Sequence, residues 1–358
     1  MNVGLLGYGV VGKGVDELLS RIEGFAVTKV FDLPKKKDEL GERYCASIEA
    51  VLEDPSIDAV IECLGGDELP YRAIKGALKA GKHVITSNKL TVATHLDEYV
   101  RLAKENGVTL QMEASCMGGV PLVYPLLNVA EADEALNFQG ILNGTSNYLL
   151  TQMEQGVSYE SALKEAQAKG FAEADPSSDV KGYDSARKIA ILSSILLHGY
   201  IAPEKVVCFG MDMVSISAIE DAKKRGNLIR LIASMQKEND GVSLLVCPTE
   251  VKKDSSFGQT KNELNLAYAS FENNGPLTFS GYGAGRYPTA MAIVQDALRL
   301  LRGGALMPSL DKAIQLASYV GGAFLAYDES GKATRLENPK IETLKGYAAL
   351  LRLEEKPE

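Results

Sequence analysis

Several features that define other classes of protein are scarce or absent in this 358-residue sequence. It has three histidines, His83, His95 and His198, and no two of them have the spacing of metal ligands. It has no Cys-x-x-Cys motif, and its five cysteines are spread widely along the chain. Such scattered thiols are typical of a reducing compartment. The sequence therefore argues against a histidine metal site and against a disulfide framework.

Excess positive charge and long apolar runs are also missing. Lys and Arg number 38 and Asp and Glu number 47, so the net charge is −9. This balance does not favour binding to nucleic acid or to an anionic membrane. No apolar run reaches the length of a membrane span, and residues 1–7 enter a strand directly, with no signal-peptide pattern. We therefore expect a soluble, cytoplasmic protein.

A glycine-rich turn opens the chain. Residues 3–6 predict a strand, residues 13–19 predict an amphipathic helix, and between them runs Gly7-Tyr8-Gly9-Val10-Val11-Gly12. In this context Gly7 makes the tight turn, Gly9 lets a pyrophosphate approach the backbone, and Gly12 lets helix and strand pack closely. The pattern predicts a dinucleotide at the N-terminus of the helix.

The identity of the dinucleotide depends on the end of the second predicted strand, 26–31. Asp32 is placed to hold a ribose 2′-hydroxyl, as in an NAD enzyme. The three lysines at 35–37 would instead neutralise a 2′-phosphate, as in an NADP enzyme. The two features conflict, so both coenzymes stay open.

Strands and helices then alternate up to about residue 113, which predicts a doubly wound parallel sheet of the Rossmann type. The loops after the strands 58–64 and 83–86 border the cofactor in such a sheet. They supply Leu64, Gly65, Ser87 and Lys89.

From about residue 130 the pattern changes to a second domain of α+β type. We expect helices at 146–155, 159–169, 183–198 and 216–236, and strands at 136–142, 242–251 and near 264–280. A glycine-dense segment then introduces a helix at 290–301 and suggests a return to the first domain. The predicted domains are 1–130 plus 281–302 for the dinucleotide, 131–280 for substrate and dimerisation, and a short tail, 303–358. In the tail we expect a helix at 309–318 and a hairpin turning at 328–331.

One charged segment, residues 173–188, carries the densest set of reactive side chains. Asp184 and Lys188 are four residues apart, so they share one face of a predicted helix at the edge of an apolar run. A partly desolvated lysine beside a carboxylate is suited to exchanging a proton near neutral pH. An ordinary solvated ion pair beside a capping loop is the structural alternative.

Together these segments resemble the homoserine dehydrogenase family over nearly all of residues 1–302. The motifs that carry the resemblance, in order, are Gly7-Tyr-Gly-Val-Val-Gly12, Thr86-Ser-Asn-Lys-Leu90, Glu113-Ala-Ser-Cys-Met-Gly-Gly-Val-Pro121, Gly140-Ile-Leu-Asn-Gly-Thr-Ser-Asn-Tyr148, Glu173-Ala-Asp-Pro with Asp184-Ser-Ala-Arg-Lys188, and Gly281-Tyr-Gly-Ala-Gly285. The resemblance implies NAD(P)-dependent interconversion of L-homoserine and L-aspartate 4-semialdehyde, in threonine and methionine biosynthesis.

The resemblance also assigns roles. Lys188 matches the proton-transferring residue, and Lys89 lies beside substrate and cofactor. Glu173 and Asp184 match acids that hold the substrate and orient the lysine, while Asp179 and Thr145 border the same pocket. Gly285 matches a late cofactor contact. The backbone carbonyls of Glu113, Cys116, Gly118 and Val120 match a sodium site.

Family members are usually dimeric through the second domain, so the resemblance implies a homodimer. Many members end in a regulatory domain, but residues 303–358 are too few for a full one. We therefore expect weak or absent feedback inhibition by threonine.

Two alternative hypotheses about the function remain from the sequence. Cys116 is a candidate nucleophile of an aspartate-semialdehyde dehydrogenase, but that chemistry needs a histidine base, and histidines are scarce. A nucleotide-binding regulator with this fold and no turnover is the second alternative. It would be expected to lack Lys89, Lys188 or Glu173, and all three are present.

Overall fold

The computed structural model describes residues 1–353, which divide into two compact units. The first unit comprises Met1–Ala132, Ser194–Tyr200 and Ala284–Lys312. The second comprises Asp133–Ser193, Ile201–Gly283 and the described residues from Ala313 onwards. Each unit therefore draws on segments that are distant in the sequence.

The first unit contains a six-stranded parallel sheet with the order β3-β2-β1-β4-β5-β6. The predicted doubly wound parallel sheet is thus confirmed. Its central strands are buried at nearly every residue, as expected for a sheet covered on both faces. The strands are β1 (Asn2–Leu6), β2 (Ala26–Phe31), β3 (Tyr44–Cys45), β4 (Ala59–Glu62), β5 (His83–Thr86) and β6 (Leu110–Gln111).

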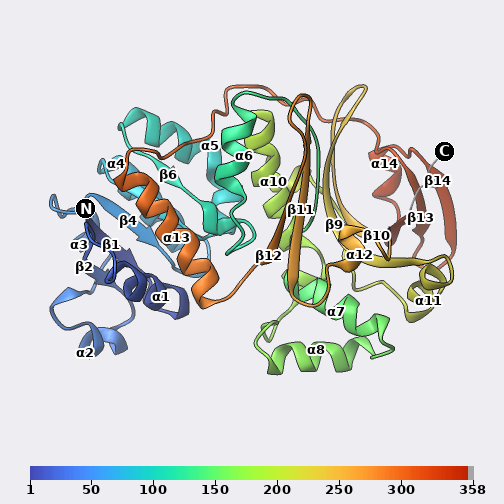
Figure 1. Ribbon diagram of the computed structural model, residues 1–358, viewed down its shortest axis with the longest axis horizontal. Helices are drawn as coiled ribbons and strands as arrows, with labels where there is room; N and C mark the ends of the chain where they lie inside the picture. Colours follow the sequence, from blue (N-terminus) through green and yellow to red (C-terminus); the bar gives the residue numbers. More distant parts are fainter. Residues whose placement is uncertain (354–358) are drawn as a thin grey trace. The chain divides into compact units, whose positions relative to one another are not determined.

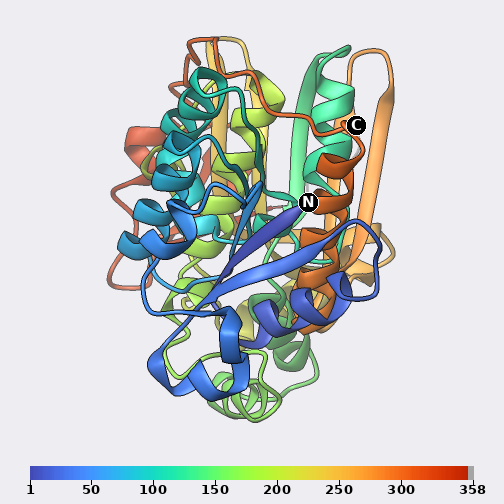
Figure 2. The same ribbon diagram turned by 90° about the vertical axis from the view of Figure 1, so that its left-hand side faces the viewer.

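The helices of this unit include one from much later in the chain. Helix α13 packs along α1, as two views show (Figures 1 and 2). The contact is close because Gly14 of α1 has no side chain: a Cβ there would lie 3.0 Å from Ala290 Cβ. The helices are α1 (Val10–Leu19), α2 (Lys37–Leu40), α3 (Glu49–Leu52), α4 (Glu68–Lys79), α5 (Lys89–Glu105), α6 (Val123–Ala130) and α13 (Arg286–Leu301).

The second unit is organised around a nine-stranded sheet with the order β12-β11-β7-β9-β10-β15-β13-β14, with β8 paired to β10. The strands are β7 (Ala135–Ile141), β8 (Val207–Cys208), β9 (Asn227–Glu238), β10 (Gly241–Lys252), β11 (Leu264–Phe271), β12 (Gly275–Tyr282), β13 (Ala323–Tyr327), β14 (Ala333–Glu337) and β15 (Ala349–Arg352). The helices are α7 (Gly144–Glu154), α8 (Tyr159–Ala168), α9 (Ser177–Val180), α10 (Tyr183–Leu197), α11 (Ile216–Lys224), α12 (Ser256–Gln259) and α14 (Ile341–Leu344); the last turn of α10 is counted with the first unit.

The predicted helix 216–236 is wrong in its second half. Helix α11 ends at Lys224, Gly226 adopts a φ of 81°, and the chain continues as β9, which pairs with β10 over its whole length. The apolar run 228–235 fits either a buried helix or a buried strand. Long-range pairing with β10 decides for the strand.

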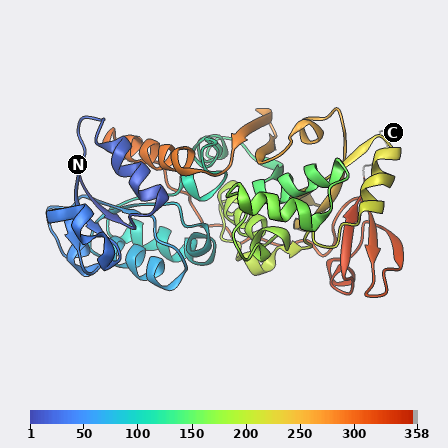
Figure 3. The same ribbon diagram turned by 90° about the horizontal axis from the view of Figure 1, so that it is seen from below.

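The C-terminal segment belongs to this sheet. The hairpin predicted to turn at 328–331 is confirmed as β13 and β14, drawn in red in Figure 3. The helix predicted at 309–318 is wrong, because the backbone of residues 315–317 instead bonds to Val242 at the start of β10. Phe324 and Leu350 are buried beside Leu245 and Cys247 of β10, so the segment shares an apolar core with the rest of the unit.

Within residues 1–353, no helix combines the length and the apolar character that a membrane crossing requires.

Candidate active site

The glycine-rich turn of the first unit has the geometry that its sequence predicts. Gly7 has a φ of +95°, which favours glycine. A Cβ on Gly12 would lie 1.9 Å from the Gly7 carbonyl oxygen, so α1 can approach the turn only through a glycine. A Cβ on Gly9 would meet no atom within 4 Å, and Val10, the first residue of α1, is exposed. An open backbone at a helix N-terminus fits a pyrophosphate.

The acid at the end of β2 faces this turn. The Asp32 carboxylate accepts hydrogen bonds from the Tyr8 backbone N–H and, at 2.6 Å, from the Leu33 N–H. These contacts fix the carboxylate beside the glycine-rich turn, where the ribose of a dinucleotide would lie. The structure therefore brings Asp32 together with Gly7 and Gly9.

The loops after β4 and β5 reach the same edge of the sheet. Strands β1, β4 and β5 are neighbours, and Leu6, Glu62 and Thr86 stand in register at their carboxyl ends. A Cβ on Gly7 would lie 2.6 Å from the Cys63 carbonyl, so the glycine-rich turn contacts the segment that leads to Leu64 and Gly65. Ser87 follows β5.

Two further predicted residues start helices of the first unit. Lys89 is the first residue of α5, whose N-cap is Asn88. Gly285 is the N-cap of α13 and has a φ of +120°, a conformation that favours glycine.

The second unit buries the predicted proton-transfer pair. Lys188 Nζ donates to Asp184 Oδ2 at 2.7 Å and to the Leu142 carbonyl at 2.7 Å. The side chains of Lys188 and Asp184 are 10% and 2% exposed. An ordinary solvated ion pair is therefore excluded, because both charges have been withdrawn from water and held by specific partners.

Asn143 belongs to this cluster, although no role was predicted for it from the sequence. Its amide Nδ2 donates to Asp179 Oδ1 at 2.7 Å and to Asp184 Oδ2 at 2.8 Å. Its Oδ1 accepts the Ser146 N–H at 2.8 Å, so the same side chain caps α7. A signal was present, because an asparagine before a predicted helix is a typical N-cap. Its links to two distant carboxylates could not be foreseen.

The remaining predicted substrate residues surround the start of α7 and the loop before α9. Thr145 Oγ1 donates to the Phe171 carbonyl at 2.6 Å, which ties that loop to α7. Glu173 lies in the same loop, with an exposed carboxylate. The structure thus groups Asp179, Asp184 and Lys188 through direct bonds or through Asn143. It places Thr145 two residues after Asn143, at the start of α7, and leaves Glu173 on the exposed loop.

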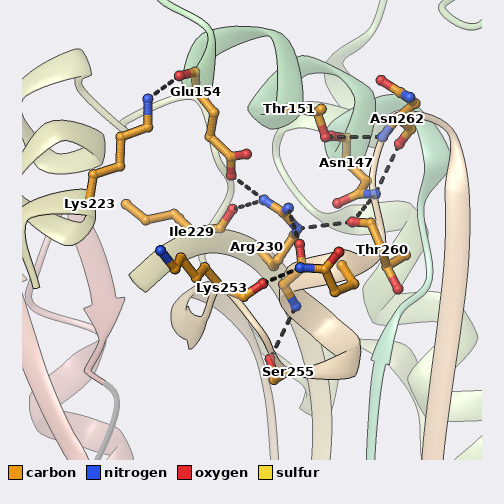
Figure 4. Close-up of polar contacts among 12 residues, drawn as sticks. Asn147, Thr151, Glu154, Lys223, Ile229, Arg230, Lys253, Ser255, Thr260 and Asn262 are labelled. Atoms are coloured by element: carbon orange, nitrogen blue, oxygen red, sulfur yellow. Dashed lines mark hydrogen bonds and ion pairs between the residues drawn. The ribbon is translucent and has the colours of Figure 1, made fainter. Parts of the chain in front are cut away.

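Helix α7 is held in place at its other end by a buried arginine (Figure 4). Arg230 of β9 is fully buried; it pairs with Glu154 of α7 and donates to the Thr260 carbonyl. Asn147 of α7 donates to the Asn262 carbonyl at 2.9 Å. These contacts fix the helix that presents Asn143.

The loop expected to bind sodium is curled by two successive residues with positive φ, Met117 (55°) and Gly118 (47°). The Glu113 carboxylate is occupied by the N–H groups of residues 122–124 at the start of α6, so only its carbonyl is available to a cation. Within residues 1–353, no protein group donates to the carbonyls of Gly118 and Val120. Backbone carbonyls in a tight loop fit a hard monovalent cation. No cluster of three or more His, Cys, Asp or Glu ligands occurs in the described part of the chain.

Family models and known proteins both match this chain over most of its length. Residues 7–113 match the model of the homoserine dehydrogenase NAD-binding domain, and residues 121–298 match the homoserine dehydrogenase model. The homoserine dehydrogenase of Bacillus subtilis is 37% identical over 317 residues, which cover 84% of this chain and 73% of that protein. The homoserine dehydrogenase of Corynebacterium glutamicum is 35% identical, covering 84% and 72%.

The chain belongs to the homoserine dehydrogenase family. The solved structure of a homoserine dehydrogenase from Thiobacillus denitrificans superposes with a TM-score of 0.88 at 27% identity, covering 99% of this chain and 98% of that one. The resemblance read from the sequence motifs is confirmed.

Family membership and geometry together bear on the alternatives. Cys116 is fully buried, so it has none of the exposure that a reactive nucleophile needs. A regulator without turnover is not favoured, because the relatives named above are homoserine dehydrogenases and the buried Lys188–Asp184 pair is intact.

Proposed function

We propose that this chain interconverts L-homoserine and L-aspartate 4-semialdehyde with a nicotinamide coenzyme, as a step in threonine and methionine biosynthesis. The observation that carries the proposal is the buried contact of 2.7 Å between Lys188 Nζ and Asp184 Oδ2. The open glycine-rich turn of the first unit is the site for the coenzyme.

In the oxidation direction the amine of Lys188 takes the proton of the primary hydroxyl. A nicotinamide coenzyme held at the glycine-rich turn would supply the acceptor for the hydride that leaves the same carbon, so that the alcohol would become an aldehyde. Asp184 and the Leu142 carbonyl hold Nζ in position for this transfer. In the reverse direction the Lys188 ammonium donates its proton to the aldehyde oxygen.

The amino group of the substrate is cationic and needs carboxylate partners. Asp179 and Asp184 are held together by Asn143, and Glu173 adds an exposed carboxylate on the adjoining loop. We assign the substrate ammonium to these acids, and assign Thr145 to the border of the same site. Lys89, at the start of α5, acts beside the coenzyme.

The surroundings of Asp32 favour NAD over NADP. Its carboxylate would hydrogen-bond a 2′-hydroxyl and repel a 2′-phosphate. The neighbouring cations have acidic partners: Lys36 contacts Glu39 at 2.9 Å, and Arg43 contacts Asp16 at 2.8 Å. Lys36, the middle lysine of the segment 35–37, is therefore less available to neutralise a 2′-phosphate.

Sodium and a second copy of the chain complete the proposal. The carbonyls of Glu113, Cys116, Gly118 and Val120 would hold the ion and brace the loop that leads into α6. We propose a homodimer, which sedimentation or light scattering would test.

The decisive experiment measures coenzyme reduction with L-homoserine, using NAD and NADP in parallel. We expect turnover by the wild type and a loss of about 10²–10⁴-fold in kcat for Lys188→Ala, with coenzyme binding retained. Lys181→Ala, an exposed lysine nearby in the sequence, is the matched control and should keep its activity. Absence of turnover with either coenzyme, in either direction, would refute the enzyme and favour the regulator.

A further inference from the structure

A buried carboxylate lies beneath the coenzyme loops of the first unit. Glu62, the last residue of β4, is fully buried. Among the described residues, the groups that hydrogen-bond its carboxylate are uncharged: the Thr86 hydroxyl and the Leu64 backbone N–H. Burial raises the pKa of its carboxyl to about 7, against the opposing effect of its hydrogen bonds. Burying a carboxylate without a cation is costly, so this residue calls for an explanation beyond packing.

The carboxylate of Glu62 joins two loops. Oε1 accepts the Leu64 backbone N–H at 2.6 Å, and Oε2 accepts the Thr86 hydroxyl at 2.5 Å. Leu64 opens the loop after β4, and Thr86 ends β5 just before the next loop. The Glu62 side chain therefore links the carboxyl ends of β4 and β5, where the two loops that would border the coenzyme begin.

Asn88 closes the network. Its backbone N–H donates to Thr86 Oγ1 at 2.9 Å, and its Nδ2 donates to the Gly66 carbonyl at 2.9 Å. The two loops are thus linked once through Glu62 and once through Asn88. The Asn88 Oδ1 also accepts the Leu90 N–H at 3.2 Å, which caps α5. The backbone of Lys89, which lies between Asn88 and Leu90, is therefore fixed by the same network.

We propose that Glu62 is a positioning residue, which sets the coenzyme loop at residues 64–66 and the N-terminus of α5 with Lys89 in a single arrangement. Because it is fully buried, Glu62 acts through Thr86 and Leu64 and does not itself touch the substrate. Two titratable groups interact electrostatically with Glu62: Cys63, which directly follows β4, and Tyr99 on α5; burial raises the pKa values of both. The inference rests on the proposed function, since it gives Lys89 its place beside the coenzyme.

The test measures NADH affinity by fluorescence, together with kcat and Tm, for Glu62→Gln, Thr86→Val and the double variant. Glu62→Gln removes the carboxylate that accepts from the Thr86 hydroxyl, and Thr86→Val removes that hydroxyl. We therefore expect each change to weaken NADH binding by about tenfold and to lower kcat. The double variant should be no worse than the more severe single variant, because contacting residues are not additive. Thr86→Ser, which retains the hydroxyl, should rescue most of the loss seen with valine, and this arm stands even if Glu62→Gln does not fold.

The matched control is Glu250→Gln in the second unit. Glu250 is also a buried carboxylate, 2% exposed; it forms an ion pair with Arg225 and accepts a hydrogen bond from Asn227. This variant should lower Tm while NADH affinity and kcat stay within about twofold. If Glu62→Gln and Thr86→Val change Tm alone, in either direction, while NADH affinity and kcat stay within about twofold of the wild type, the positioning role is refuted. Failure of the proposed function would give a different result: the wild-type protein would bind NADH but would not oxidise L-homoserine. The NADH affinity of the variants would still decide the role of Glu62.

Discussion

Asn143 offers a direct test of how the buried acids are held. One amide connects Asp179 and Asp184 and also caps α7, so two substitutions can separate these tasks. Asn143→Ala removes all three hydrogen bonds. Asn143→Ser keeps an oxygen that can cap the helix, but it is too short to reach both carboxylates.

The expected magnitudes follow from the contacts. Loss of an N-cap costs about 1 kcal/mol, and loss of each hydrogen bond to a carboxylate costs about 1.5–3 kcal/mol. Relaxation and water entry recover part of the sum, so Asn143→Ala should lower the free energy of unfolding by about 3–5 kcal/mol. Asn143→Ser should be about 1 kcal/mol more stable than the alanine variant. Both should lose about 10²-fold in kcat, because Asp184 no longer holds its place beside Lys188.

Urea unfolding and the initial rate of coenzyme reduction measure these two effects separately. The bridging role would be refuted if the serine variant kept kcat within about twofold of the wild type. The capping role would be refuted if the alanine and serine variants were equally stable. If both variants lose activity and the serine variant is about 1 kcal/mol more stable than the alanine variant, then Nδ2 holds the carboxylates and Oδ1 caps α7.

Three further predictions concern other parts of the chain. Burial raises the pKa of Glu62 from 4.5 to about 7, so its ionisation in the folded state destabilises the protein as pH rises through that range. In urea titrations the stability of Glu62→Gln relative to the wild type should therefore rise between pH 5 and pH 8, by up to about 3–4 kcal/mol; a relative gain toward low pH would contradict this. Asp32→Ser should shift the ratio of kcat/KM for NADP to that for NAD upward by about tenfold, since it removes the repulsion of a 2′-phosphate; an unchanged ratio would place coenzyme selection elsewhere. Arg230→Met should cost about 3–5 kcal/mol, because it leaves the buried Glu154 carboxylate unpaired, and a second change, Glu154→Gln, should recover part of that loss; equal stability of the single and double variants would show that the pair is not coupled.

Much of the coenzyme side could be predicted because its requirements are local. The glycine-rich turn needs particular backbone conformations and close approaches within a few residues, as Gly7 and Gly12 show. The alternation of short apolar strands with helices predicts the parallel sheet for the same reason. The spacing of Asp184 and Lys188 likewise places both side chains on one helical face before any tertiary contact is considered.

Other features depend on contacts between distant segments. The apolar run after Gly226 suits a helix or a strand, and pairing with β10 decides it. The sequence predicts only a short tail at residues 303–358, but the pairing of β15 with β10 and β13 makes the segment from Ala313 onwards part of the second sheet. Glu62 reads as an ordinary residue at the end of a strand until Thr86 is seen beside it.

The sequence alone predicted the class of the first domain, the glycine-rich turn and the shared helical face of Asp184 and Lys188, because each follows from short-range geometry and periodicity. Only the tertiary structure decided that this pair is buried, that Asn143 joins it to Asp179 across 36 residues, and that Glu62 ties together two loops. Burial and long-range hydrogen bonds depend on which distant segments meet, and no local pattern carries that information.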